Sequence, residues 1–327
     1  MLRRDLLAGA LLAAGSACSR RASSLDKLRV GVSRRLSASS FHLALERGYF
    51  REAGFAIEIL QAAGPLNAIA LLSGGQCDVH FGSLNTALLN AIVKGLPIRI
   101  VAGREIARAT CGDVGAIYGM RRTFPHGLAD AAPLKGKRVA TGLAIGIAQF
   151  ALDAQLAAAG LSTTDVTTVS LGFQQNTAAL LAGGVDAMVA TGDFDRDPAS
   201  LSSELVHTPG LARIYPDFQH SYIFYGRTML AASPDRGARF LSAYLRGARE
   251  FAHGKTPRFM AEFAKAGGLD VKQVVSACRD TFVVDGAIDR NSLRLFADWA
   301  ARRKFIPRAV EVSELVDDRF LKRSHAS

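Results

Sequence analysis

Few residues of this 327-residue chain stand in the patterns that catalysis requires. The seven histidines are dispersed, and none forms the His-x-x-x-His or His-Glu pair of a zinc site. The sequence has neither a Gly-x-Ser-x-Gly nucleophile elbow nor a Gly-x-x-x-x-Gly-Lys-Ser/Thr phosphate loop. The glycines of Gly142-Leu143-Ala144-Ile145-Gly146 are not spaced as in a dinucleotide-binding loop. The missing motifs favour a binding protein over an enzyme.

Metal-ligating residue types are present but poorly arranged. Carboxylates alternate at Asp193, Asp195 and Asp197, yet the segment lacks the glycine and the distal Glu of a calcium loop. A solvated turn is therefore the better interpretation of these three residues. His42 lies in a predicted helix and His80 in a predicted strand, and we interpret both as structural residues rather than ligands. We expect no metal and no other cofactor.

Polar residues recur where the predicted strands end. In open α/β sheets, ligands bind beyond the carboxyl ends of the strands, where N–H groups of the following helices point outward. Each Ser, Thr or Asn there is also explained as a helix cap. As a set facing one cleft they predict a ligand site, and the helix starts favour an anionic group. The positions are Ser37, Ser39, Ser40, Gln61, Ala62, Gly64, Ser83, Asn85, Thr141, Gly142, Gln149, Thr191, Gly192 and Asp193.

The elements that position these residues alternate between short apolar strands and helices. This alternation predicts a mostly parallel sheet with helices on both faces. The predicted strands are 28–33, 56–61, 78–83, 98–103, 137–141 and 166–171. The predicted helices are 39–54, a helix from Pro65 to Gly74-Gly75, 85–94, 144–159 and 176–181.

A repeated segment indicates two similar halves. Leu71-Leu72-Ser73-Gly74-Gly75-Gln76-Cys77-Asp78-Val79 and Leu180-Leu181-Ala182-Gly183-Gly184-Val185-Asp186-Ala187 both contain a helix end, a double glycine and an Asp that opens a strand. The two copies lie about 110 residues apart. We therefore predict two similar α/β lobes.

The lobes are predicted to be joined by two crossing segments. Strands 114–120 and 222–230 lie where the alternating strands and helices of one predicted lobe give way to those of the other. The tail from Pro234 has helical periodicity and is expected to pack on the first lobe. The predicted lobe 1 is discontinuous, with lobe 2 inserted between its parts. Lobe 1 comprises 27–121 and 221–321, and lobe 2 comprises 122–220.

Residues 1–24 are predicted to be an export signal. Arg3-Arg4 precede a short apolar stretch and small residues that lead to Cys18, and Arg3-Arg4-Asp5-Leu6-Leu7 resembles a twin-arginine signal. The small residues before Cys18 resemble a lipobox, in which this cysteine becomes the lipidated first residue. Gly15 departs from the usual Leu, and an ordinary cleaved signal is the alternative.

The remaining cysteines and the net charge restrict other functions. With Cys18 lipidated, Cys77, Cys111 and Cys278 allow at most one disulfide, and Cys77–Cys111 is the pair that we consider. The formal charge of +11 is not gathered in one basic stripe with interleaved aromatics, so we expect no nucleic-acid binding. The basic residues instead occur as pairs at Arg34-Arg35, Arg121-Arg122, Arg302-Arg303 and Lys322-Arg323.

Three motifs in order carry a family resemblance. They are Ala44-Leu45-Glu46-Arg47-Gly48-Tyr49-Phe50, then Gly74-Gly75-Gln76-Cys77-Asp78, then Lys94-Gly95-Leu96-Pro97. With them the chain resembles the solute-binding proteins of ABC importers for nitrate, sulfonates, taurine and thiamine precursors. Leu134-Lys135-Gly136-Lys137 resembles the family's entry to the second lobe. The resemblance covers about residues 28–300 and is weak beyond 195.

The resemblance implies the type 2 periplasmic binding protein fold, with two doubly wound lobes that close on a ligand by a hinge. It places ligand-binding residues at the strand ends already described, and it adds the helix start at Gly146. Leu84-Asn85-Thr86 departs from the family's usual stretch, which leaves the ligand open. The implied ligand-binding residues are Ser37, Ser39, Gly64, Ser83, Asn85, Thr141, Gly142, Gly146, Thr191 and Asp193.

The leading hypothesis is therefore a monomeric periplasmic binding protein, anchored to the membrane at Cys18. It would deliver a small organic ligand, with an anionic group favoured, to a permease and an ATPase. Sulfonate, nitrate, carboxylate and pyrimidine ligands all remain open. The alternatives are an enzyme of the branch that makes a thiamine pyrimidine, against which the export signal argues, and a ligand sensor for a membrane partner.

Overall fold

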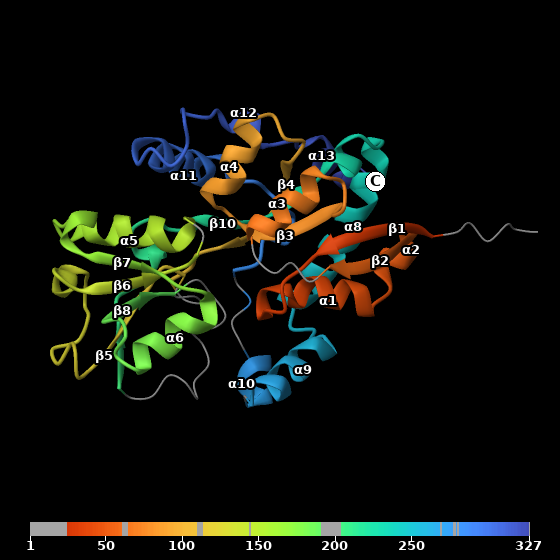
Figure 1. The fold of residues 1–327 in the computed structure, drawn as a ribbon. Helices are drawn as coiled ribbons and strands as arrows, with labels where there is room; N and C mark the ends of the chain where they lie inside the picture. The colour runs from red at the N-terminus through yellow and green to blue at the C-terminus, as the bar shows by residue number, and fades with distance from the viewer. Residues whose placement is uncertain are drawn as a thin grey trace, which may run out of the picture.

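The computed structural model describes residues 25–60, 65–109, 114–143, 145–190, 204–268, 270–276, 279 and 281–326. This part of the chain forms two lobes, each with a mixed five-stranded sheet (Figure 1). The strand order is β2-β1-β3-β10-β4 in the first sheet and β7-β6-β8-β5-β9 in the second. The α/β architecture with two lobes, predicted from the alternation and the repeat, is confirmed.

The first sheet consists of β1 (Asp26–Gly31), β2 (Phe55–Leu60), β3 (Val79–Ser83), β4 (Arg99–Ile106) and β10 (Gln219–Tyr225). β1 pairs in parallel with β2 and β3, whereas β10 runs antiparallel to β3 and β4. Apolar residues on both faces of this sheet are buried, because helices cover each face. One face is covered by α1 (Ser39–Glu46), α2 (Tyr49–Glu52) and α8 (Pro234–Ala252), and the other by α3 (Pro65–Ser73) and α4 (Thr86–Val93).

The second sheet repeats this arrangement on a smaller scale. It consists of β5 (Ile117–Met120), β6 (Arg138–Thr141), β7 (Thr167–Ser170), β8 (Ala187–Val189) and β9 (Leu205–His207). β6 pairs in parallel with β7 and β8, and β5 is antiparallel to β8 and β9. α5 (Ile147–Ala158) and α6 (Phe173–Leu181) lie on opposite faces of this sheet (Figure 1).

The segment predicted as one helix over 39–54 is divided into α1 and α2. Gly48 between them has a φ of 76°, a left-handed conformation that ends a helix and that glycine adopts at little cost. The predicted start of α3 at Pro65 and its end before Gly74-Gly75 are confirmed, and Gly75 is also left-handed, with a φ of 72°.

The repeated double-glycine segment forms the same ion-paired clamp in both lobes. In the first lobe, the Asp78 carboxylate accepts hydrogen bonds from the backbone N–H of Arg29 at 2.7 Å and from its Nε at 3.3 Å. The Arg29 guanidinium also donates to the carbonyl oxygen of Gly75 at 2.6 Å. The clamp thus joins two neighbouring parallel strands to the end of the helix that precedes the second strand.

In the second lobe, Asp186 accepts from the backbone N–H of Arg138 at 2.8 Å and from its Nε at 3.3 Å. The Arg138 guanidinium donates to the carbonyl oxygens of Gly184 at 2.7 Å and Gly183 at 3.0 Å. The hydrogen bond from the Arg138 side chain lowers the pKa of Asp186 below its ordinary value. The two arginines complete a pattern of which the sequence comparison had identified only the glycines and the aspartates.

The tail from Pro234 packs largely on the first lobe. α13 (Arg319–His325) lies against α8, and α12 (Val312–Leu315) lies against α4. α11 (Arg290–Arg302) packs beside β10 and also reaches the second lobe. The remaining helices of this part are α7 (Arg227–Leu230), α9 (Arg258–Gly267) and α10 (Val271–Val275).

The crossing segments differ from the prediction. Strands 114–120 and 222–230 were expected to cross between the lobes, but β5 belongs to the second sheet and β10 to the first. Strand pairing therefore places the first change of lobe between Ile106 and Ile117 rather than at 121. Segments 114–120 and 222–230 are apolar because β5 and β10 are each buried inside a sheet. The connections themselves lie side by side, since the Ala107 N–H donates to the Phe218 carbonyl at 2.8 Å.

No helix within the described ranges combines the length and the apolar character needed to cross a bilayer. The predicted export signal at 1–24, including Cys18, lies outside these ranges, as do Cys111 and Cys278. Cys77, the proposed disulfide partner of Cys111, is a buried free thiol.

Removing the carboxylate from each clamp tests their contributions to stability. The Asp78 side chain is 5% exposed and that of Asp186 is 25% exposed, so the first clamp is better shielded from water. We expect Asp78→Ala to lower the free energy of unfolding by about 2–4 kcal/mol and Asp186→Ala by about 1 kcal/mol. Urea unfolding followed by circular dichroism measures both. Equal losses of stability in the two variants would contradict the expectation that the better shielded clamp contributes more.

Candidate ligand-binding cleft

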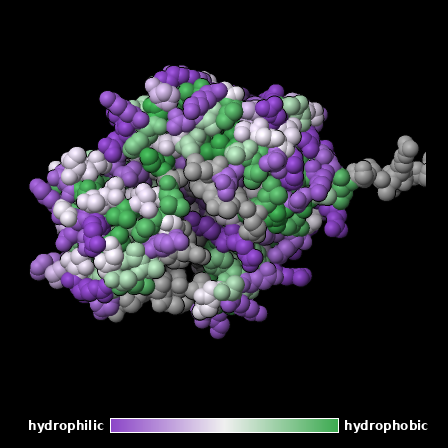
Figure 2. All heavy atoms as spheres, in the orientation of Figure 1, coloured by the Kyte–Doolittle hydropathy of each residue, from purple (hydrophilic) through white to green (hydrophobic). Residues whose placement is uncertain are grey.

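The carboxyl ends of the parallel strands in the two lobes face one another. β3 ends at Ser83 on the first lobe, and β6 ends at Thr141 on the second. The helices that follow these strands, α4 and α5, begin at the line where the lobes meet (Figure 1). Figure 2 shows that the molecular surface is hollowed between the lobes. Open α/β sheets bind ligands in this position, as the sequence analysis anticipated.

At one place the two lobes touch through their backbones. The Thr86 N–H, at the start of α4, donates a hydrogen bond to the Ile145 carbonyl at 2.9 Å, and Asn85 forms an isolated antiparallel bridge with Gly146. A Cβ atom at Gly146 would lie only 2.9 Å from the carbonyl oxygen of Leu84. Glycine at 146 therefore permits the close approach of the two lobes.

Asn85 and Ser83 lie beside this contact. Asn85 is the N-cap of α4, with its Oδ1 accepting from the Leu88 N–H at 2.9 Å, and its Nδ2 donates to the Ser83 carbonyl at 3.2 Å. The cap interpretation therefore accounts for the Asn85 side chain without a ligand. Ser83 is exposed at the end of β3.

The second lobe contributes the loop from β6 to α5. Thr141 is buried and Gly142 is partly buried, whereas Leu143 is 74% exposed and Ile145 is 40% exposed. The N-cap position of α5 is Gly146, which supplies no side-chain cap to the N–H groups of the first turn. The loop thus combines a helix start that favours an anion with apolar side chains that favour an organic group. Thr141, Gly142 and Gly146 were predicted as ligand-binding residues, whereas Leu143 and Ile145 of the same loop were not singled out.

The serines after β1 are less open than predicted. Ser37 is partly buried in a short 3₁₀ helix (Leu36–Ala38). Ser39 is fully buried, and its hydroxyl has no hydrogen-bond partner among the described residues. It stands one turn from Leu36 and Leu43, which pack with Met260 of α9 and Val274 of α10. Ser39 thus lies on a covered helix face and not on the exposed wall of the cleft.

The other serine of this segment has a structural partner. The Ser40 hydroxyl lies 3.3 Å from the hydroxyl of Tyr244 in α8. Gln149 is likewise buried and donates to Asp153 at 2.8 Å within α5. The other predicted positions, Gln61, Ala62, Gly64, Thr191, Gly192 and Asp193, lie outside the described residues.

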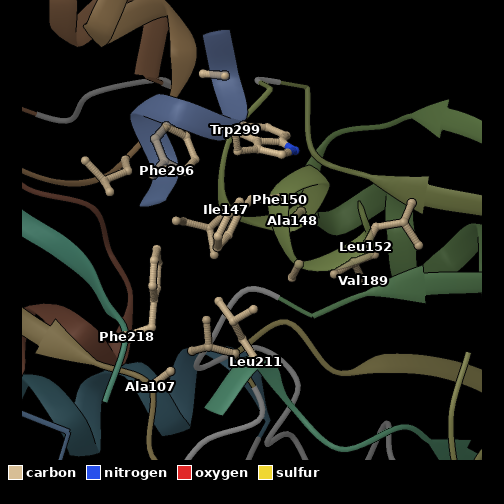
Figure 3. Packing of buried hydrophobic residues seen from close by; sticks show 14 of the residues in the cluster. Ala107, Ile147, Ala148, Phe150, Leu152, Val189, Leu211, Phe218, Phe296 and Trp299 are labelled. Atoms are coloured by element: carbon tan, nitrogen blue, oxygen red, sulfur yellow. The ribbon is translucent and has the colours of Figure 1, made fainter. Parts of the chain in front are cut away.

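An apolar seam joins the lobes beside the cleft. Phe150 of α5 stacks on Phe218, which immediately precedes β10, at 5.0 Å between ring centroids. It also meets Phe296 and Trp299 of α11 edge-on, at 5.7 Å and 5.4 Å (Figure 3). The C-terminal helix α11 therefore contacts the second lobe directly, and the prediction that the tail packs on the first lobe was incomplete.

The carboxylate of Asp153 makes polar contacts across this seam. Asp153 of α5 accepts from the indole Nε1 of Trp299 at 2.9 Å and from the Nε of Arg303 at 3.0 Å. Its side chain is 11% exposed. Trp299 is the only tryptophan of the chain, so its indole reports on the contact between the lobes.

Catalytic and metal-binding groups are sparse in the described part of the chain. No group of three or more His, Cys, Asp or Glu side chains in it is placed to hold a metal. Burial raises the pKa of the Cys77 thiol to about 11, and the thiol contacts the Val79 carbonyl at 3.1 Å. At neutral pH this thiol is protonated and is a weak nucleophile.

Comparison with known proteins gives a family and a fold. The model of the family described as NMT1/THI5 like matches residues 37–255. None of the curated proteins matches the chain.

Solved structures resemble the chain over almost its whole length. The alkanesulfonate-binding protein SsuA from Xanthomonas axonopodis pv. citri, bound to MOPS, has a TM-score of 0.70 and 19% identity, covering 91% of this chain and 100% of that one. The periplasmic nitrate-binding protein NrtA from Synechocystis PCC 6803 has a TM-score of 0.71 and 14% identity, with coverages of 92% and 88%. The desulfurization enzyme DSZB has a TM-score of 0.60 and 14% identity, with coverages of 92% and 99%. The type 2 periplasmic binding protein fold is thereby confirmed.

A methyl group at Gly146 tests the contact between the lobes. Because the added Cβ would crowd the Leu84 carbonyl, we expect Gly146→Ala to push the lobes apart and to cost about 1–3 kcal/mol of stability. Small-angle X-ray scattering measures the separation, and thermal unfolding measures the cost.

The matched control is Gly172→Ala at the N-cap of α6. Its added methyl would meet only the end of the Gln175 side chain, which can move aside. The role of Gly146 would be contradicted if both variants scattered like the parent.

Proposed function

The chain belongs to the NMT1/THI5-like family, and from that premise we propose that it is the solute-binding component of an ABC importer. In this proposal the protein captures a small organic ligand between its lobes and delivers it to a membrane permease and its ATPase. The observation that carries the proposal is the open cleft beside the Thr86–Ile145 backbone contact. Two lobes joined at one edge and open at the other are suited to close on a ligand.

The walls of the cleft support an organic ligand with an anionic group. The start of α5 lacks a side-chain cap and offers N–H donors, while Leu143 and Ile145 offer exposed apolar surface. An alkanesulfonate has both an anionic and an apolar part, whereas nitrate has no apolar part. The relatives bind ligands of both kinds according to their descriptions. For this chain the two exposed apolar side chains favour the organic class.

An enzymatic role is the second candidate, because DSZB shares the fold. One structure of that enzyme is of a cysteine-to-serine mutant in complex with biphenyl-2-sulfinic acid. In the present chain Cys77 is buried and its pKa is raised to about 11 by burial, which does not suit a nucleophile.

The location of the protein is part of the same proposal. Export through the signal at 1–24 would place the lobes in the periplasm, and a lipid on Cys18 would hold them near the permease. β1 begins at Asp26, so only a short segment separates this anchor from the first lobe.

Ligand binding is expected to raise the melting temperature and to change the fluorescence of Trp299. A ligand at 100 times its dissociation constant adds about 2.7 kcal/mol to the free energy of unfolding. Trp299 hydrogen-bonds Asp153 of the other lobe, so rotation of one lobe against the other about this seam changes its surroundings. The panel is MOPS, ethanesulfonate, nitrate, lactate, 4-aminopyrimidine and biphenyl-2-sulfinate. If none of these compounds raised the melting temperature, the proposal would be contradicted. Release of sulfite from biphenyl-2-sulfinate would favour the enzyme.

Substituting the predicted lipid-bearing cysteine tests the anchor. We expect the full-length protein to sediment with membranes and Cys18→Ser to remain in the soluble periplasmic fraction, because the acyl chains supply the membrane affinity. Cys77→Ser serves as the control and should still sediment. A Cys18→Ser variant that stays with the membrane would refute anchoring through this residue.

A further inference from the structure

His80 occupies an unusual position in the first sheet. It lies on β3, and its ring fills the space above two glycines. A Cβ atom on Gly31 of β1 would lie 2.9 Å from Nδ1 of His80, and one on Gly82 would lie 2.6 Å from Nε2. Any larger residue at 31 or 82 would therefore displace the ring. The ring leans over Gly82, toward the end of β3 that opens on the cleft.

The hydrogen bonding of the ring fixes its tautomer. Nδ1 lies 3.2 Å from the Gly31 carbonyl oxygen, which can only accept, so Nδ1 carries the proton. Burial lowers the pKa of His80 to about 4, so the ring is neutral at physiological pH. In a neutral ring of this tautomer, Nε2 is a hydrogen-bond acceptor. None of the described residues donates a hydrogen bond to it.

His80 is largely buried but is not sealed from solvent. The ring is desolvated enough to lose basicity, yet the residue is still partly exposed. Phe224 of β10 stacks beside it at 6.1 Å between ring centroids. Exposed Ser83 lies one residue beyond Gly82, in the direction in which the ring leans. Glycine, the Phe224 ring and the Cys77 thiol thus lie close to the ring, Arg104 acts on it by its charge, and Nε2 has no partner among the described residues.

We propose that His80 is a specificity-determining residue of the cleft, whose Nε2 accepts a hydrogen bond from an N–H or O–H group of the ligand. This inference rests on the proposed function, because it requires a small molecule between the lobes. A site built to receive a donor discriminates strongly against analogues without one, since the buried acceptor is then left unpaired. The ligand accordingly has a donor in addition to its anionic or apolar parts, and nitrate is excluded.

Matched ligand pairs that differ only in the donor provide the test. The pairs are isethionate with 2-methoxyethanesulfonate, lactate with 2-methoxypropionate, and 4-aminopyrimidine with 4-(dimethylamino)pyrimidine. Dissociation constants come from Trp299 fluorescence, and the ¹⁵N chemical shift of His80 Nε2 reports whether that atom accepts a hydrogen bond. We expect the donor-bearing member of the binding pair to bind about tenfold more tightly and to shift the Nε2 resonance.

Three variants separate hydrogen bonding from packing. His80→Phe keeps a ring but removes the acceptor, and it should abolish the preference within a pair. His80→Gln retains an acceptor oxygen and should restore part of the preference. His42→Phe is the matched control, because His42 also has a pKa lowered to about 4 by burial but stacks on Phe259 of α9.

The outcomes distinguish the two proposals. Equal binding of both members of a pair to the parent protein, or a preference that survives in His80→Phe, would overturn the role of His80 while leaving the proposed function standing. If no member of any pair bound, the proposed function and this inference would both be contradicted. Circular dichroism of each variant confirms folding before titration.

Discussion

The cleft depends on a backbone contact between two lobes, each of which is an α/β unit with its own sheet. The Thr86 N–H and the Ile145 carbonyl meet because Gly146 has no side chain to hold Leu84 away. This contact brings the starts of α4 and α5 together, and with them the carboxyl ends of both sheets. The Phe150 seam with α11 keeps the same edge packed. One edge is thus held together while the other stays open, and the cleft follows from that asymmetry.

Much of the fold could be predicted from the sequence, because its local signals agree with its packing. The double glycines with their aspartates predicted two equivalent lobes, and the clamps of Arg29 and Arg138 explain why the segment recurs. The crossing segments were misplaced because apolar periodicity identifies a strand but does not reveal its sheet. β5 and β10 are buried strands whose partners are distant in sequence, and only tertiary pairing assigns them.

The cleft was predicted in outline, and its individual residues were harder to identify. Ser, Thr and Asn at strand ends have the same sequence signature whether they cap a helix or face a ligand, and Asn85 proved to be a cap. Ser39 could not be recognised as covered, because α9 and α10, which pack against its helix, come over 200 residues later. Leu143 and Ile145 belong to the predicted loop but were not singled out, because exposed apolar residues cannot be told from core residues by type. His80 was considered structural, and its glycine neighbours on two strands become visible only in the sheet.

The twin clamps also bear on how such a chain can change over time. Each one lies where β3 or β8 begins, at the end of the strand away from the cleft, and ties strand to strand through backbone groups. The ion pairs that join neighbouring strands in each lobe therefore lie away from the loops that would meet a ligand. Substitutions in those loops can alter specificity without loosening the frame that carries them. The residues that join the strands and the residues that would contact a ligand are thus separate sets, so the same fold can carry cleft loops of different sequence.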